Sequence, residues 1–352
     1  MEFNLSRHTS NSAVADIVKT SVAALGPLMA LFFLLLFGLP ALAQTRIAEA
    51  VLGSQGAAAV SNSFTDEIGR RVEIPVDVKR IVSLAPNLTE IVFALGEGDR
   101  LAGDTDYCDY PAEATKKPHV GGTVNPNLEQ VVALAPDVVL ATAINRRETV
   151  DALARIGVPV YATDPHSVDG MIASVENIGK ILHAEKNAAP LAEDLRGRLS
   201  NLDRRMAGIE PRRVLFVVWT APLISIGSGT FIADALRRAG ARSVVETTEE
   251  WPRVNLEEIV RLQPEFLVFP GAHGGDTQHG IDALRARPGW RDLDALRRGK
   301  IVIISDAINR PAPRMVDAVE QLARALHPES FARSELSTAP AYLGEEVCSC
   351  AR

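Results

Sequence analysis

NLEQVVALAPD, residues 127–137, recurs 128 residues later as NLEEIVRLQPE, residues 255–265. Both copies run directly into an apolar stretch that is typical of a buried strand. An offset of this size corresponds to about one small α/β lobe. The repeat therefore predicts two similar lobes related by a pseudo-twofold axis.

Each copy of the repeat predicts a short helix followed by a strand. Asn127 and Asn255 are expected N-caps, and Gln130 and Glu258 complete the spacing of a capping box. The apolar positions recur at intervals of three and bury one helix face. The proline near the end of each copy ends the helix and starts the strand.

Glu129 and Glu257 occupy the first turn of these two helices. A local explanation suffices for one copy, because the helix dipole favours an anion at that place. Two matched copies also suggest docking. Exposed carboxylates on two similar lobes fit a two-fold partner that presents arginines, with one carboxylate for each partner subunit.

Strands and helices alternate along the rest of the chain. A hairpin is expected over residues 64–74, and a helix over 87–95 with Asn87 as N-cap and Glu90 three residues on. Strands are expected at 81–84, 137–141, 158–163, 214–218, 266–269 and 300–304, and helices at 147–156, 184–209, 231–239, near 281–284 and at 313–326. The predicted fold class is α/β, with two similar lobes built on mainly parallel sheets and bridged by the long helix at 184–209.

The chain therefore divides into six expected segments. Residues 1–43 are a signal peptide, 44–63 a linker, 64–166 the N-terminal lobe, 167–210 a connecting segment with the backbone helix, 211–327 the C-terminal lobe and 328–352 a tail. The apolar run before the sequence Ala-Leu-Ala at 41–43 predicts cleavage and export to the periplasm. An uncleaved membrane anchor is the alternative.

Composition excludes several classes of protein. A net charge of −7 without a basic stripe argues against nucleic acid as a partner. Three cysteines, with Cys348 and Cys350 in the tail, cannot make a disulfide framework. No nucleophile elbow, phosphate-binding loop or dinucleotide-binding motif occurs, so an enzyme is not expected and no intrinsic cofactor is implied. An exported enzyme of unknown type stays a minor alternative.

Five stretches carry a resemblance to a known family: RIVSLAPNLTE (80–90), DYCDYP (106–111), VGGTVNPNLE (120–129), WPRVNLE (251–257) and RPAPR (310–314). Together they resemble the helical-backbone periplasmic binding proteins of ATP-driven importers for cobalamin, ferric siderophores and haem. The resemblance covers about residues 80–326 and is strongest to the cobalamin-binding branch.

The resemblance implies a monomeric receptor that captures a cobalamin-like corrinoid between its lobes. Its partner is then an ABC permease dimer in the inner membrane, with separate ATPase subunits. The family pattern places Glu129 and Glu257 opposite arginines of that permease, which agrees with the docking hypothesis drawn from the repeat. Because a helix joins the lobes, closure is expected to be small.

The resemblance also implies ligand contacts. Tyr107 and Trp251 match aromatic residues of the cobalamin cleft, and Asp306 and Arg310 match polar contacts. The alternative for both aromatics is ordinary core packing, and Trp219 is open to either interpretation. Thr123 stands where the family has a cleft tryptophan.

A second expected cleft aromatic falls near Thr142, so the cleft is less aromatic than in the cobalamin branch. A ferric siderophore or haem therefore remains an alternative ligand. A zinc or manganese receptor would need clustered histidines, whereas the histidines here are scattered along the sequence.

Overall fold

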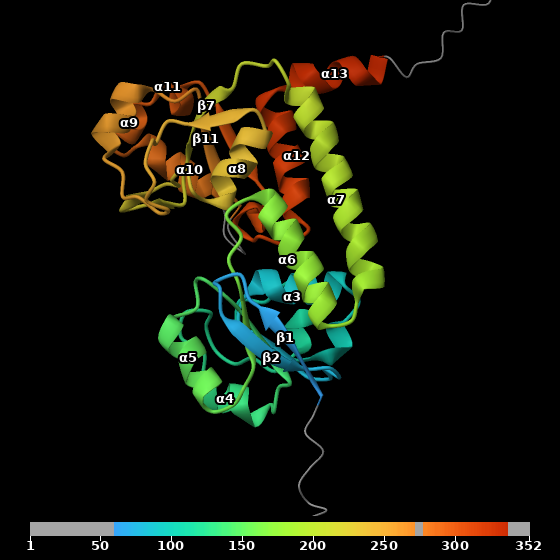
Figure 1. The fold of residues 1–352 in the computed structure, drawn as a ribbon. Coiled ribbons are helices and arrows are strands. Elements are labelled where there is room, and N and C mark those ends of the chain that lie inside the picture. Colours follow the sequence, from blue (N-terminus) through green and yellow to red (C-terminus); the bar gives the residue numbers. More distant parts are fainter. Residues whose placement is uncertain (1–59, 272–276, 337–352) are drawn as a thin grey trace, which may run out of the picture. The chain divides into compact units, whose positions relative to one another are not determined.

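The computed structural model describes residues 60–271 and 277–336. From Ser61 onward these residues belong to one compact unit. Within it, two sheets of four parallel strands form two lobes (Figure 1). The first sheet contains β3 (Ile81–Ser83), β4 (Leu101–Gly103), β5 (Val138–Thr142) and β6 (Val160–Thr163). The second contains β7 (Arg212–Phe216), β10 (Ala241–Ser243), β11 (Phe266–Pro270) and β12 (Ile301–Ile304).

The two sheets share one strand order. It is β4-β3-β5-β6 in the N-terminal lobe and β10-β7-β11-β12 in the C-terminal lobe. In each sheet, the lobe's first strand along the chain has the second strand on one side, at the edge of the sheet. The third and fourth strands follow on its other side. This common topology agrees with the sequence repeat, and the predicted α/β class with two similar lobes is confirmed.

Helices cover both faces of each sheet. The N-terminal lobe has α3 (Pro86–Ala94), α4 (Leu128–Ala133) and α5 (Arg147–Arg155), and the connection has α6 (Val168–Ile181) and α7 (Glu185–Met206). The C-terminal lobe has α8 (Phe231–Arg238), α9 (Leu256–Leu262), α10 (Thr277–Arg285), α11 (Asp294–Arg297), α12 (Met315–Leu326) and α13 (Pro328–Leu336). Two hairpins, β1 (Ser61–Thr65) with β2 (Arg71–Pro75) and β8 (Trp219–Thr220) with β9 (Leu223–Ile224), complete the strands. Short 3-10 helices lie at Gly98–Arg100, Ala114–Lys116, Trp290–Asp292 and Asp306–Asn309.

One apolar core runs through both lobes. Alternate residues of each strand face it: in β5, Val138 and Leu140 join this core, whereas Val139 and Ala141 pack on the opposite face with α4 and α5. In the C-terminal sheet Val268 faces the shared core. Buried residues of α3, α6, α7, α8 and α12 fill the space between the sheets. A core shared in this way resists a large change in the angle between the lobes.

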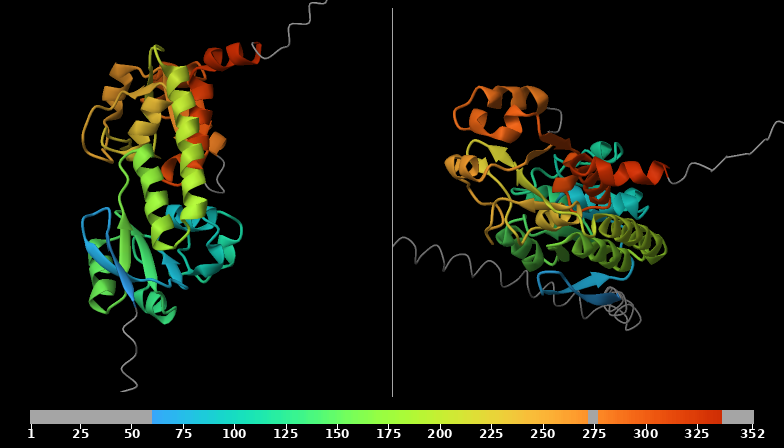
Figure 2. Two further views of the ribbon diagram at one scale, coloured as in Figure 1. Left: turned by 45° about the vertical axis from the view of Figure 1, so that its right-hand side comes forward. Right: turned by 90° about the horizontal axis from the view of Figure 1, so that it is seen from above.

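The backbone helix α7 is 22 residues long, which corresponds to about 33 Å of helix. Figure 2 shows it beside α6, spanning both lobes. Its buried residues are Ala188, Ala192, Leu195, Leu199, Leu202 and Met206. Arginines fix it to the C-terminal lobe: Arg198 pairs with Asp317 and Glu320 of α12, and Arg238 of α8 pairs with Asp203.

Several local expectations differ from the structure. Asn87 is not an N-cap, because Pro86 takes the first helical position and Ala85 is the cap residue. The short edge strands β4 and β10 and the helix α6 were not expected from the sequence, and β1 begins inside the expected linker. The expected tail begins with α13, where Phe331 lies under Arg205 at 4.7 Å.

The expected signal peptide and the two tail cysteines lie outside the described residues. Within the described part, no helix has both the length and the apolar character needed to cross a membrane.

Candidate functional site

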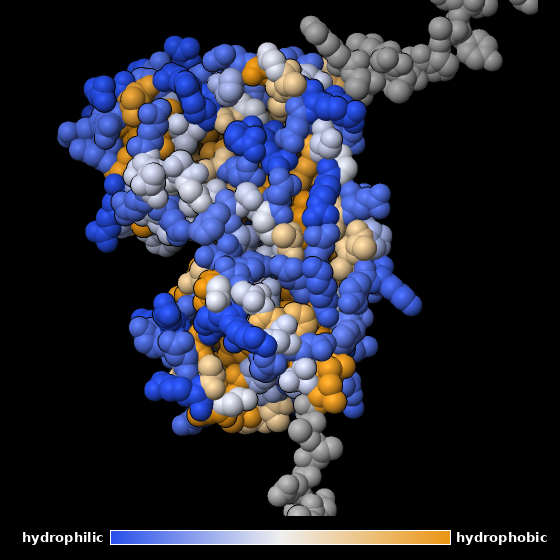
Figure 3. All heavy atoms as spheres, viewed as in Figure 1, coloured by the Kyte–Doolittle hydropathy of each residue, from blue (hydrophilic) through white to orange (hydrophobic). Residues whose placement is uncertain are grey.

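A cavity of about 360 Å³ lies between the two lobes. Its walls include Thr142 at the end of β5, Asp164 after β6 and Asn309 after β12, so it opens at the carboxyl ends of the strands. Figure 3 shows the surface hollowed between the lobes. Ligands of open parallel α/β sheets bind at this edge, and the volume is typical of small-molecule sites. We call this cavity the cleft.

Aromatic side chains line the cleft from both lobes. Tyr107 lies in the loop after β4 and is 62% exposed, and Trp251 precedes α9 and is 39% exposed. These exposures exclude ordinary core packing for both residues. Phe231, the first residue of α8, adds a third ring that the sequence did not point to. Trp219 is 61% exposed and is not among the residues that line the cleft.

Threonines occur at or near the two positions where the resemblance implied aromatic residues. Both Thr123 and Thr142 line the cleft, next to the exposed side chain of Ile144. Buried Asn145 holds these loops together, because its Nδ2 donates to the Thr123 carbonyl at 2.6 Å and to the Leu84 carbonyl at 3.1 Å. Its Oδ1 accepts from the Thr142 N–H at 2.8 Å. One amide therefore fixes three segments of the cleft wall.

Arg310 is a charged residue on the floor of the cleft, and its side chain is only 9% exposed. Its Nη1 lies 2.6 Å from Asp109 Oδ1 and 3.1 Å from Glu90 Oε1, and its Nε lies 3.4 Å from Asp306 Oδ2. Burial by itself would lower the pKa of Arg310, but the hydrogen bonds to Asp109 and Glu90 raise it above its ordinary value. Asp306 is not among the residues that line the cleft; it pairs with Arg310.

Glu90 joins the two lobes through this floor. It lies on α3 with a side chain 2% exposed, and it binds Arg314, at the start of α12, through two hydrogen bonds of 2.7 and 2.9 Å. The Arg314 guanidinium also lies 3.6 Å from the centre of the Tyr110 ring. We call Glu90, Asp109, Arg310 and Arg314 the interlobe ion cluster. Its members come from segments about 200 residues apart in the sequence.

Two carboxylates lie at the cleft wall with a histidine between them. The Nε2 of His166 is 3.3 Å from Asp164 Oδ2, and its Nδ1 is 3.9 Å from Glu250 Oε1 of the other lobe. All three residues line the cleft. No group of three or more metal-ligating side chains with metal-site geometry occurs among the described residues.

Asp104, which follows β4, and His119 form a separate pair, and neither residue is among those that line the cleft. His119 Nδ1 lies 2.8 Å from Asp104 Oδ1, and Asp104 is buried. Burial raises the pKa of Asp104 to about 6, although the hydrogen bond from His119 opposes this shift. Cys108 is also buried nearby, and burial raises the pKa of its thiol.

Glu129 and Glu257 are both exposed and lie at the start of α4 and α9. The expected N-caps are present: Asn127 Oδ1 accepts from the Glu129 N–H at 3.1 Å, and Asn255 Oδ1 accepts from the Glu257 N–H at 2.9 Å. In a complete capping box the side chain of Gln130 would accept from the Asn127 N–H. In the first copy that N–H donates to the Val120 carbonyl instead.

An arginine fixes the other end of each of these helices. Arg80 Nε donates to the Leu134 carbonyl at 2.7 Å, and Arg213 Nη1 donates to the Leu262 carbonyl at 3.0 Å. Leu134 and Leu262 are equivalent positions of the repeat. The next residues, Ala135 and Gln263, both adopt a left-handed conformation with φ of 45° and 46°. The repeat therefore includes the backbone and the arginine that anchors each helix to its sheet.

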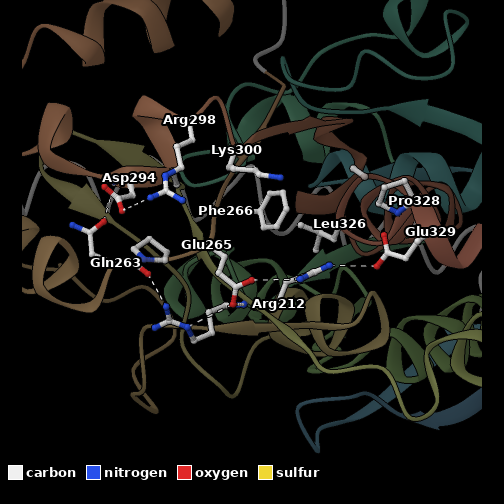
Figure 4. A pocket seen from close by; sticks show the side chains of 14 residues that line it. Arg212, Gln263, Glu265, Phe266, Asp294, Arg298, Lys300, Leu326, Pro328 and Glu329 are labelled. Carbon is white, nitrogen blue, oxygen red and sulfur yellow. Dashed lines mark hydrogen bonds and ion pairs between the residues drawn. The ribbon is translucent and has the colours of Figure 1, made fainter.

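A second hollow, of about 510 Å³, lies in the C-terminal lobe at the amino ends of β7, β11 and β12 (Figure 4). Most of its charged side chains are paired: Arg212 lies between Glu265 and Glu329, and Arg298 pairs with Asp294, while Lys300 lies over the Phe266 ring. Ligands of α/β sheets bind at the opposite edge. The hollow is larger than the cleft, but its paired side chains hold the end of α9 in place. We therefore take the cleft as the candidate site.

Known proteins match most of this chain. An uncharacterised substrate-binding lipoprotein of an ABC transporter from Bacillus subtilis is 31% identical over 280 residues, covering 76% of this chain and 86% of the relative. The vitamin B12-binding protein of Yersinia pestis is 30% identical over 246 residues, covering 69% of this chain and 85% of the relative.

Solved structures agree with the fold. The periplasmic vitamin B12-binding protein of Vibrio cholerae has a TM-score of 0.63 at 27% identity, covering 72% of this chain and 98% of its own. The periplasmic haem-binding protein of Roseiflexus has a TM-score of 0.64 at 26% identity, covering 72% of this chain and 99% of its own. The sequence profile of the periplasmic binding protein family matches residues 81–307. These matches confirm the expected resemblance and the expectation of a binding protein that is not an enzyme: the chain belongs to the periplasmic binding protein family.

Proposed function

We propose that this chain is the substrate-binding subunit of an ABC importer and captures a cobalamin-like corrinoid in the cleft. The observation that carries this proposal is the pair of exposed aromatic rings, Tyr107 and Trp251, which line one cavity from opposite lobes. Flat rings facing a cavity suit the face of a macrocycle, and a few polar groups suit its rim.

The relatives support a metal chelate as the ligand class. The matched proteins include several that are named vitamin B12-binding proteins, and the matched structures include haem-binding proteins. A corrinoid is the first choice because a relative at 30% identity is a vitamin B12-binding protein. Haem or a ferric siderophore is the second choice, because Thr123 and Thr142 make this cleft less aromatic than the resemblance implied.

Ligand titration tests the proposal. We expect cyanocobalamin to bind the purified protein in calorimetry, and Trp251→Ala to lose that binding. Trp219→Ala is a control, since Trp219 is also an exposed tryptophan but is not among the cleft-lining residues. Haem and a ferric hydroxamate are titrated alongside. Absence of cyanocobalamin binding at micromolar concentration, with either of the other ligands bound, would overturn the corrinoid assignment.

Glu129 and Glu257 are the proposed docking points for a permease dimer. Both are exposed on helices fixed at each end, so each carboxylate has a defined position on its lobe. We place the protein in the periplasm as a monomer, where it delivers ligand to the permease and its ATPase subunits. Periplasmic export rests on the signal-peptide pattern of residues 1–43 and on the family.

Charge reversal tests the docking proposal. Glu129→Lys with Glu257→Lys should abolish ligand uptake by the reconstituted transporter and leave ligand affinity unchanged. Glu258→Lys is the control, because Glu258 is exposed on the same helix one position further on. Loss of ligand affinity in the double variant, or normal uptake, would contradict the assigned role.

A further inference from the structure

The charged groups of the cleft are mostly negative. Among its described lining residues the carboxylates are Asp164 from the N-terminal lobe and Glu250 from the C-terminal lobe, with His166 between them. Asp164 is 30% exposed and Glu250 is 55% exposed. Both can therefore meet a ligand that enters the cleft.

Arg310 does not offset these charges for a ligand. Its guanidinium is 9% exposed and is already shared by Glu90, Asp109 and Asp306. Arg314, the other arginine of the interlobe ion cluster, is bound to Glu90 and stacked on Tyr110. To bind an anionic ligand group, Arg310 would have to leave buried partners. Breaking a buried ion pair is strongly unfavourable.

The same cleft suits an uncharged or cationic rim. Amide N–H groups donate to carboxylates, and a cationic group is attracted to them in a partly desolvated cavity. A carboxylate at the same place would meet Asp164 or Glu250 as a like charge, and would also lose its own hydration. The negative charge of the cleft therefore distinguishes ligands that have a similar shape but a different charge.

We propose that the cleft selects metal chelates whose rim is neutral or cationic and rejects the carboxylate forms of the same macrocycle. This selection rests on the proposed function, that the cleft binds the chelate. Asp164 and Glu250 are the specificity-determining residues, and Glu90 and Asp109 are positioning residues that keep Arg310 neutralised.

Corrinoids that share the same ring but differ in charge test this selection. The full chain is titrated with cyanocobalamin and cationic aquacyanocobinamide, whose rims carry amides, and with cobyrinic acid, whose rim carries carboxylates. We expect both amide corrinoids to bind, and the carboxylate form to bind more weakly by on the order of tenfold or more. Equal affinity for the amide and carboxylate forms would overturn the selection while leaving the corrinoid function intact.

Matched variants assign the effect to the named residues. Asp164→Asn with Glu250→Gln should tighten binding of cobyrinic acid several-fold. Asp109→Asn should act in the same direction, because it releases part of the Arg310 charge. Glu249→Gln, an exposed neighbour that is not among the lining residues, should leave both affinities unchanged. A gain of the same size in Glu249→Gln would contradict the assignment.

A second probe pair separates the two proposals. If no corrinoid binds, the corrinoid function fails, and cationic ferrioxamine against anionic ferric enterobactin decides the charge preference. Binding of ferrioxamine alone supports the selection. Binding of ferric enterobactin with equal or higher affinity overturns it, and absence of binding by either pair overturns both proposals.

Discussion

Replacing Glu90 with Gln should destabilise the protein strongly, because it removes the central charge of the interlobe ion cluster. The Glu90 carboxylate accepts three hydrogen bonds, of 3.1, 2.9 and 2.7 Å, from Arg310 and Arg314. Breaking a fully buried ion pair costs about 3–5 kcal/mol. Arg310 keeps Asp109, and Arg314 is 25% exposed, so we expect the free energy of unfolding to fall by about 2–4 kcal/mol.

Urea unfolding followed by tryptophan fluorescence measures this loss. Glu176→Gln is the matched control, because Arg196 also binds that carboxylate through two hydrogen bonds of 2.7 Å, but the pair lies at the surface. The control should lose at most about 1 kcal/mol. Adding Arg314→Met to Glu90→Gln should recover part of the stability, since the unpaired charge is removed as well. Equal losses in Glu90→Gln and Glu176→Gln would refute the view that the buried cluster holds the lobes together.

Changes at the two helix caps, at Arg238 and at Asp104 also have defined outcomes. Asn127→Ala and Asn255→Ala should each lower the free energy of unfolding by about 1 kcal/mol in urea titrations, and their effects should add because the caps lie in different lobes. Arg238→Ala should lower the melting temperature in calorimetry by several degrees, because three carboxylates around the buried guanidinium lose their shared partner. Burial raises the pKa of Asp104 from 3.8 to about 6. Between these two pH values the carboxyl is protonated in the folded protein but ionised in the unfolded chain. The free energy of unfolding should therefore fall as pH rises through that window, and Asp104→Asn should remove this slope.

The sequence predicted the lobes and the strands of their sheets because those features have local periodicity. The buried runs at β5, β6, β11 and β12 were expected within about two residues of their bounds. The three-residue edge strands β4 and β10 were missed, since so short a run has no alternation to detect. The N-caps Asn127 and Asn255 were predicted because a cap acts within its own turn.

Glu90 shows where local inference ends. Its spacing from Asn87 fits a capping box, yet its carboxylate binds arginines more than 200 residues away. A long-range ion pair leaves no pattern in the nearby sequence. His166 and Asn145 were missed for the same reason, as their partners lie in other loops. The anchoring arginines Arg80 and Arg213 each directly precede an apolar run in the sequence, but nothing nearby indicates which carbonyl they bind.

The anchored helices α4 and α9 have a consequence for recognition of the loaded protein. Each is capped at its start and held by an arginine at its end, so these hydrogen bonds tie the backbone at Glu129 and Glu257 to its own lobe. The span between the two carboxylates then varies only with the angle between the lobes. Under the docking proposed above, a partner with fixed spacing of its arginines would bind best at one value of that angle. A change of that angle on binding of cargo would then alter the affinity for the partner without any contact between partner and cargo.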